Sequence, residues 1–152
     1  MRQLGFKLPP PPSPLGSYSG AVQAGELLFL SGMLPLIEGK PAITGKVGQD
    51  VTTEQGRGAA LIAALNALAT ANHHLGEPTL LRSVVRVGVT VASAPDFTQH
   101  PAVADGASRL FADIFGSEPG HTRLAVGVEN LPLGAPVLLE VIFGIGEGEA
   151  GY

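Results

Sequence analysis

Alternation of apolar and polar positions predicts the strands of this chain. Residues 83–92 place valines at every second position, with Arg86, Gly88 and Thr90 between them, which is typical of a strand with one buried face. Residues 32–49 are rich in Gly and Pro, so we expect a loop with at most one short strand. Shorter apolar runs predict four more strands, the first two joined in a hairpin by Ala24-Gly25-Glu26: residues 17–23, 27–31, 123–129 and 137–145.

Two segments predict helices. Thr52-Thr53-Glu54-Gln55 has the form of a capping box, and the helix that follows should stop before Gly76 and Pro78. Its apolar stripe is expected to consist of leucines: Leu61, Leu65, Leu68 and Leu75. The second helix should cover residues 101–115 and turn four side chains inward: Val103, Leu110, Phe111 and Ile114.

This order of elements predicts an α+β fold, a mixed β-sheet with two helices on one face. If Leu124, Val126 and Val128 point toward the helices, then Arg123 and its alternate neighbours point away. In the last strand both sets of alternating residues are largely apolar, whereas a strand face in water is normally polar. We therefore expect the sheet face without helices to pack against another subunit in a symmetric oligomer.

Composition narrows the functional classes. Charged residues make up only 14% of the 152 residues, and the net charge of -4 gives no basis for sequence-independent nucleic-acid binding. The absence of cysteine excludes disulfides, thiol catalysis and cysteine-ligated zinc. No apolar run approaches membrane-spanning length, so we expect a cytoplasmic protein without membrane contact. Residues 1–14, which include a proline run, should form an extended arm before a single domain over residues 15–152.

Arg123 is the most informative residue because it opens an otherwise apolar strand. A guanidinium is costly to bury without a partner, and its planar fork matches a carboxylate. One interpretation is therefore a cleft for a small carboxylate ligand. The other is an internal ion pair with Glu129 or Glu140.

Four segments of the chain match a known pattern when they are taken together: Pro14 to Tyr18, Phe29 to Pro35, Asp105 to Ser108, and Arg123 through Leu131-Pro132 to Glu140. With these segments the chain resembles the YjgF family, also called the RidA or reactive-intermediate deaminase family and often labelled endoribonuclease L-PSP. The resemblance covers roughly residues 15–145. It implies a chorismate-mutase-like fold, a homotrimer with clefts between subunits, and hydrolysis of imines or enamines to 2-oxo acids and ammonia.

The resemblance also implies roles for particular residues. Arg123 would hold the carboxylate of a 2-oxo or 2-imino acid, and the other residues of the cleft would be Tyr18, Ser31, Gly32 and Asp105. Two positions depart from the family pattern. Leu138 stands where deaminating members have a water-activating glutamate, and Ala125 stands where a cysteine is common.

The loss of the usual acid leaves the catalytic group open. Glu140 is one candidate for proton transfer and a structural ion pair is its alternative, while His121 is either a second candidate or an exposed loop histidine. Asp105 could instead cap the second helix, and the Ser31 hydroxyl could simply fix its loop. Neither a metal nor a cofactor site is expected. A non-catalytic binding protein is therefore the alternative to an imine hydrolase, and ribonuclease activity rests on the family label alone.

Overall fold

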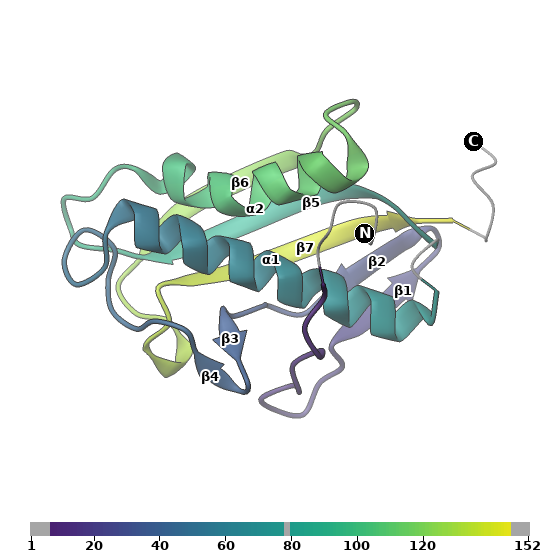
Figure 1. Ribbon diagram of the computed structural model, residues 1–152, viewed down its shortest axis with the longest axis horizontal. Coiled ribbons are helices and arrows are strands. Elements are labelled where there is room, and N and C mark those ends of the chain that lie inside the picture. Colours follow the sequence, from purple (N-terminus) through teal and green to yellow (C-terminus); the bar gives the residue numbers. More distant parts are fainter. Residues whose placement is uncertain (1–6, 78–79, 147–152) are drawn as a thin grey trace.

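The computed structural model describes residues 7–77 and 80–146, in which two helices cover one face of a five-stranded sheet (Figure 1). The sheet order is β1-β2-β7-β5-β6. Only β5 and β6 are parallel, and the other neighbours are antiparallel. The predicted α+β class with helices on one face is confirmed. The strand bounds are β1 Ala21–Ala24, β2 Leu27–Leu30, β5 Leu81–Ala92, β6 Thr122–Val128 and β7 Val137–Ile145.

The N-terminal hairpin and the glycine-rich segment differ in detail from the prediction. Strand β1 starts later than residue 17 because Tyr18 N–H turns back to the Gly16 carbonyl. The segment after β2 holds two short paired strands rather than at most one, β3 Leu36–Ile37 and β4 Lys40–Pro41. They form because Glu38 and Gly39, both at positive φ, close a two-residue turn.

Helix α1 spans Thr53–Leu75, and its predicted capping box is present. Thr52 accepts from the Gln55 backbone while the Gln55 side chain accepts from the Thr52 N–H. Gly76 ends the helix in the left-handed conformation. Pro78 lies outside the described residues, as does the part of the predicted arm before Lys7.

The buried face of α1 consists mainly of alanine, and of the predicted leucine stripe only Leu68 is fully buried. The other three leucines of that stripe are only partly buried at the margins of the core. Small side chains let the helix lie close to the sheet, and the valines of β5 and β7 supply the bulk instead. The alanines are Ala59, Ala60, Ala63, Ala64, Ala67 and Ala71.

Helix α2 spans His100–Phe115 and buries three of its four predicted inward residues, Val103, Leu110 and Phe111. It lies very close to α1, because a Cβ placed on Gly106 would stand 2.0 Å from the backbone oxygen of Arg57. The N-cap is Gln99. Asp105 therefore sits inside the helix, and its interpretation as a helix cap was wrong.

The edge strand β6 faces the opposite way from the orientation considered above. Arg123, Ala125 and Gly127 lie opposite Val87, Val89 and Val91 of β5, whose side chains are buried beneath the helices. Leu124, Val126 and Val128 consequently point to the opposite face of the sheet, which carries no helices and which we call the outer face. There the sheet exposes apolar side chains on β1, β2, β5 and β6: Val22, Phe29, Val85, Leu124, Val126 and Val128.

Candidate functional site

Arg123 lies between β6 and α2, where Asp105 and Ser108 reach it from one face of the helix. Its Nη1 donates to Asp105 Oδ1 at 2.7 Å and to Ser108 Oγ at 3.2 Å. The side chains of Arg123 and Asp105 are 26% and 37% exposed, so the pair is partly open to solvent. The internal partner of Arg123 is thus Asp105, and the suggested ion pairs with Glu129 and Glu140 were wrong.

Asp105 orients the guanidinium without using all its donors. Both described interactions of Arg123 run through Nη1, while Nη2 and Nε carry the remaining N–H groups of the fork. A guanidinium held by one carboxylate is preorganised to bind a second anion, since less side-chain freedom is lost on binding. Arg109, one turn along α2, stands 4.0 Å from the other Asp105 oxygen and adds positive charge beside the pair.

Ser108 connects Arg123 to His121. The Ser108 Oγ lies 2.9 Å from His121 Nε2. Because Oγ accepts from Arg123, its own proton can go to Nε2 of a neutral imidazole, which then carries its proton on Nδ1. His121 is half-buried and packs edge-on against Phe111, with ring centroids 6.4 Å apart, so it is not the exposed loop histidine considered above.

The environment of His121 favours the neutral ring. Burial lowers the pKa of His121 below its ordinary value of 6.5, and the positive charge of Arg123 lowers it further. A neutral imidazole next to a hydroxyl is able to accept a proton near neutral pH. Of the two predicted candidates for proton transfer, His121 and Glu140, His121 is the one connected to Arg123 within a single chain, through Ser108.

Three other predicted residues lie near β1 and β2, at the other end of the strand order from β6. The Tyr18 hydroxyl accepts from the Leu15 backbone N–H at 3.1 Å, and the ring is about half exposed. Ser31 Oγ donates to the Ser19 carbonyl at 2.6 Å, a bond that fixes the loop. Gly32 is exposed, and a Cβ added there would meet the Leu138 side chain at 3.2 Å.

Glu140 and Leu138 lie on the outer face of the sheet, since their neighbours in β7 are buried on the helix side. Glu140 is exposed opposite Gly88, and Leu138 is half-buried opposite Thr90. Within one chain, neither side chain shares a face with Arg123. Apart from Glu140 on the central strand β7, the predicted residues form two groups, one on β6 and α2 and one near β1 and β2.

The separation of these groups follows from the strand order. Four inter-strand spacings lie between β1 and β6, and at about 4.8 Å each they amount to roughly 19 Å. One chain therefore does not bring Tyr18, which precedes β1, to the Arg123 guanidinium. Gly32 lies against Leu138 of β7, nearer the middle of the sheet.

Ser108 is the site residue that the sequence interpretation did not assign. The available signal was its spacing, because residues three apart on a helix share a face and Asp105 had already been selected. Neither a group of three metal-ligating side chains nor a helix long and apolar enough to cross a bilayer occurs within residues 7–77 and 80–146.

Comparison with known proteins agrees with the family resemblance found in the sequence. A family described as "YjgF/chorismate_mutase-like, putative endoribonuclease" matches residues 1–144. Protein TCP17 of Trypanosoma cruzi is 38% identical over 143 residues, which cover 93% of this chain and 89% of that protein. The structure of Atu1372 from Agrobacterium tumefaciens has a TM-score of 0.84 at 38% identity, covering 95% of this chain and 88% of the other.

A more distant relative carries the name of an activity. A 2-iminobutanoate/2-iminopropanoate deaminase of Dermatophagoides farinae is 28% identical over 132 residues, covering 86% of this chain and 88% of that protein. The resemblance found in the sequence is thus confirmed across almost the whole chain. The chain belongs to the YjgF/chorismate-mutase-like family.

Proposed function

We propose that this protein binds a small 2-imino or 2-oxo acid at Arg123 and hydrolyses the imine. The observation that carries the proposal is the partly exposed guanidinium, held by Asp105 through Nη1 alone. Its Nη2 and Nε donors match the spacing of two carboxylate oxygens, a geometry that favours bidentate binding. The named activity of the relative from Dermatophagoides farinae supports this substrate class.

The Ser108–His121 pair is our proposed route for the proton. Water adds to the imine carbon and gives one proton to the pair, which returns it to the nitrogen to form a carbinolamine. The pair then moves the hydroxyl proton of the carbinolamine to the nitrogen as the C–N bond breaks, so that 2-oxo acid and ammonia leave and the pair is again neutral. Neutral His121 suits this step because its pKa is lowered by burial and by Arg123. The pair would replace the carboxylate that Leu138 removes from the usual position.

The complete cleft requires a second copy of the chain. Tyr18, Ser31 and Gly32 would come from the neighbouring subunit. In their own chain the strand order keeps Tyr18 away from Arg123, and Gly32 lies against Leu138. The exposed apolar residues of the outer face supply a surface for assembly, with Phe29 41% and Leu124 51% exposed in the single chain. We expect a homotrimer with three equivalent clefts, and Glu140 and Leu138 then lie in its interface.

A non-catalytic binding role is the second candidate, and Leu138 is the observation that favours it. An apolar side chain against Gly32 offers nothing to orient water. In that case the protein would retain carboxylates at Arg123 without turning over an imine. The two functions share a binding site and differ only in ammonia release.

Ammonia release from 2-aminoacrylate, generated in situ, tests the proposal. We expect acceleration over buffer, which Arg123→Ala should abolish and which His121→Gln should reduce with little change in KM. Lys40→Ala, which removes an exposed cation on β4, should retain the activity and serves as the control. Calorimetric titration with pyruvate separates the two candidates. Binding that depends on Arg123 without turnover supports the non-catalytic role, whereas an unchanged affinity in Arg123→Ala refutes both.

A further inference from the structure

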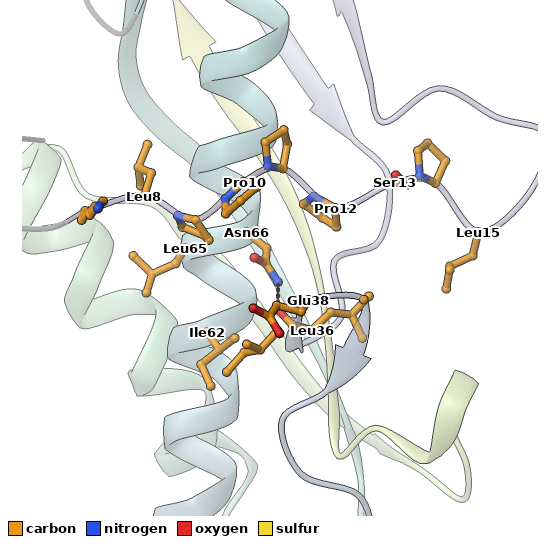
Figure 2. A pocket seen from close by; sticks show the side chains of 16 residues that line it. Leu8, Pro10, Pro12, Ser13, Leu15, Leu36, Glu38, Ile62, Leu65 and Asn66 are labelled. Atoms are coloured by element: carbon orange, nitrogen blue, oxygen red, sulfur yellow. Dashed lines mark hydrogen bonds between the residues drawn. The ribbon is translucent and has the colours of Figure 1, made fainter.

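A cavity of about 690 Å³ lies beneath the proline-rich segment, away from Arg123. Three segments enclose it: residues 7–15, which we call the arm; the middle of α1; and the β3–β4 turn. Figure 2 shows the arm crossing above Leu65 and Asn66 of α1, with Leu36 of β3 and Glu38 of the β3–β4 turn nearby. The volume lies within the range of about 300–1,000 Å³ that is typical of small-molecule sites.

The walls of this cavity are mainly apolar. Ile62 and Leu65 line it from the helix, and Leu36 lines it from β3. The arm contributes five prolines, which have no backbone N–H and therefore offer carbonyl oxygens only. A ligand would thus meet an apolar surface interrupted by acceptors, with few donors.

Asn66 places one such acceptor at the cavity. The residue is only 2% exposed, and its Nδ2 donates to the carbonyls of Leu34 at 3.1 Å and Leu36 at 3.0 Å. These two bonds use both amide protons and fix the orientation of the side chain. No donor among residues 7–77 and 80–146 pairs with its Oδ1. This oxygen is therefore available to accept a hydrogen bond from a ligand in the cavity.

Glu38 adds a negative charge to the same lining. Its backbone is left-handed, with φ of 53°, a conformation that is unfavourable for residues other than Gly, Asn and Asp. No ion pair engages its carboxylate within the part of the chain that is described. Lys7 is the one cation in the lining, and it lies at the exposed start of the arm. The charged side chain that lines the cavity near Asn66 is therefore the negative carboxylate of Glu38.

We propose that this cavity is a second ligand site, which takes a small apolar amine. The hydrocarbon body would lie between the arm and α1, and the ammonium would donate to Asn66 Oδ1 and Glu38. The site is independent of the proposed imine chemistry, because it shares no residue with the cluster around Arg123. An Arg123→Ala variant should bind the amine with unchanged affinity.

Calorimetry with three probes of similar shape tests the chemistry of the site in the full-length Arg123→Ala variant, in which the proposed carboxylate site is removed. Phenethylamine offers a cationic donor, 2-phenylethanol a neutral donor and phenylacetate only an anionic acceptor. We expect phenethylamine to bind about tenfold or more tightly than phenylacetate, with 2-phenylethanol between them. Tighter binding of phenylacetate, or no binding of the two donors, would overturn the proposal.

Two pairs of variants locate the site. Ile62→Trp should fill the cavity and weaken phenethylamine binding about tenfold or more, whereas Leu61→Trp, on the adjacent face of α1, should not. Glu38→Gln should weaken binding of the amine but not of the alcohol, and Glu118→Gln serves as its exposed control. Asn66 is left unchanged because its amide also holds Leu34 and Leu36. Unaltered binding in Ile62→Trp would refute the location, and equal losses of amine and alcohol in Glu38→Gln would refute the role of its charge.

Discussion

Replacement of Gly106 by alanine should destabilise the protein by separating its two helices. The added Cβ would stand 2.0 Å from the Arg57 backbone oxygen and 2.9 Å from its carbonyl carbon. Ordinary contacts begin near 3.4 Å, so α2 must move by about 1 Å or more. A backbone carbonyl cannot rotate away as a side chain can. The movement would also displace Asp105 and Ser108, which flank Gly106 on α2, relative to Arg123 on β6.

The magnitude follows from two opposing effects. Overpacking costs about 1–3 kcal/mol, and replacement of a helical glycine by alanine returns up to about 1 kcal/mol. We expect a net loss of about 1–2 kcal/mol, which lowers Tm by about 2–8 °C in a domain of this size. Gly58→Ala is the matched control, because Gly58 is exposed on α1 with nothing within 4 Å of the new Cβ.

Thermal unfolding of both variants at one protein concentration decides the matter. Gly58→Ala should raise Tm by up to about 4 °C, since only the helix propensity changes. The two glycine substitutions thus have opposite expected signs. An unchanged or higher Tm for Gly106→Ala would refute the close helix contact as the reason for glycine at this position.

Three other outcomes follow from the structure. The free energy of unfolding should fall as pH drops below 6.5 and level off below the folded pKa of His121, because the unfolded chain binds a proton at His121 more readily than the folded chain does. His121→Gln should remove this part of the pH dependence, measured by urea titration at several pH values. An identical pH dependence in the variant would contradict the lowered pKa. Phe143→Ala should cost about 3–5 kcal/mol in the same assay, since Phe143 is fully buried edge-on against Phe111. Val126→Glu on the outer face should yield a monomer in sedimentation, whereas a monomeric wild-type chain would contradict the assembly.

The sequence predicted those parts of the fold that have a local cause. The capping box at Thr52 and the glycine stop at Gly76 depend on neighbouring residues, and both are present. The valines of β5 alternate as predicted only from Val87 to Val91, because a register shift between Val84 and Arg86 leaves Val85 exposed. The alanines of the buried α1 face were not predicted, because hydrophobicity favours leucine over alanine. What selects alanine is the close approach of the helix to the sheet, which is a tertiary property.

The site was predicted in its residues better than in its geometry. Arg123 and Asp105 were both selected, but the sequence did not indicate that they pair. Both faces of β6 are made of small or apolar residues, so alternation could not decide which face meets the helices. The parallel register with β5 decides it, because the residues opposite Val87, Val89 and Val91 must share their buried face. That register is a long-range pairing and leaves no mark in the local pattern.

Strand β6 couples assembly to ligand binding in the proposed function. Alternate residues of one edge strand serve two surfaces, with Arg123 next to α2 and Leu124 and Val126 on the outer face. Packing of a second copy against the outer face would fix the position of β6, and the same copy would bring its β1–β2 edge to the guanidinium. A substitution on the outer face should therefore weaken carboxylate binding even though the substituted residue does not contact the ligand. The reason is that a chain that no longer assembles lacks the part of the cleft that the neighbouring subunit would supply. Charge changes at Asp105 would act differently, since they alter the guanidinium within a single chain. The two kinds of substitution thus separate formation of the cleft from its preference for anions.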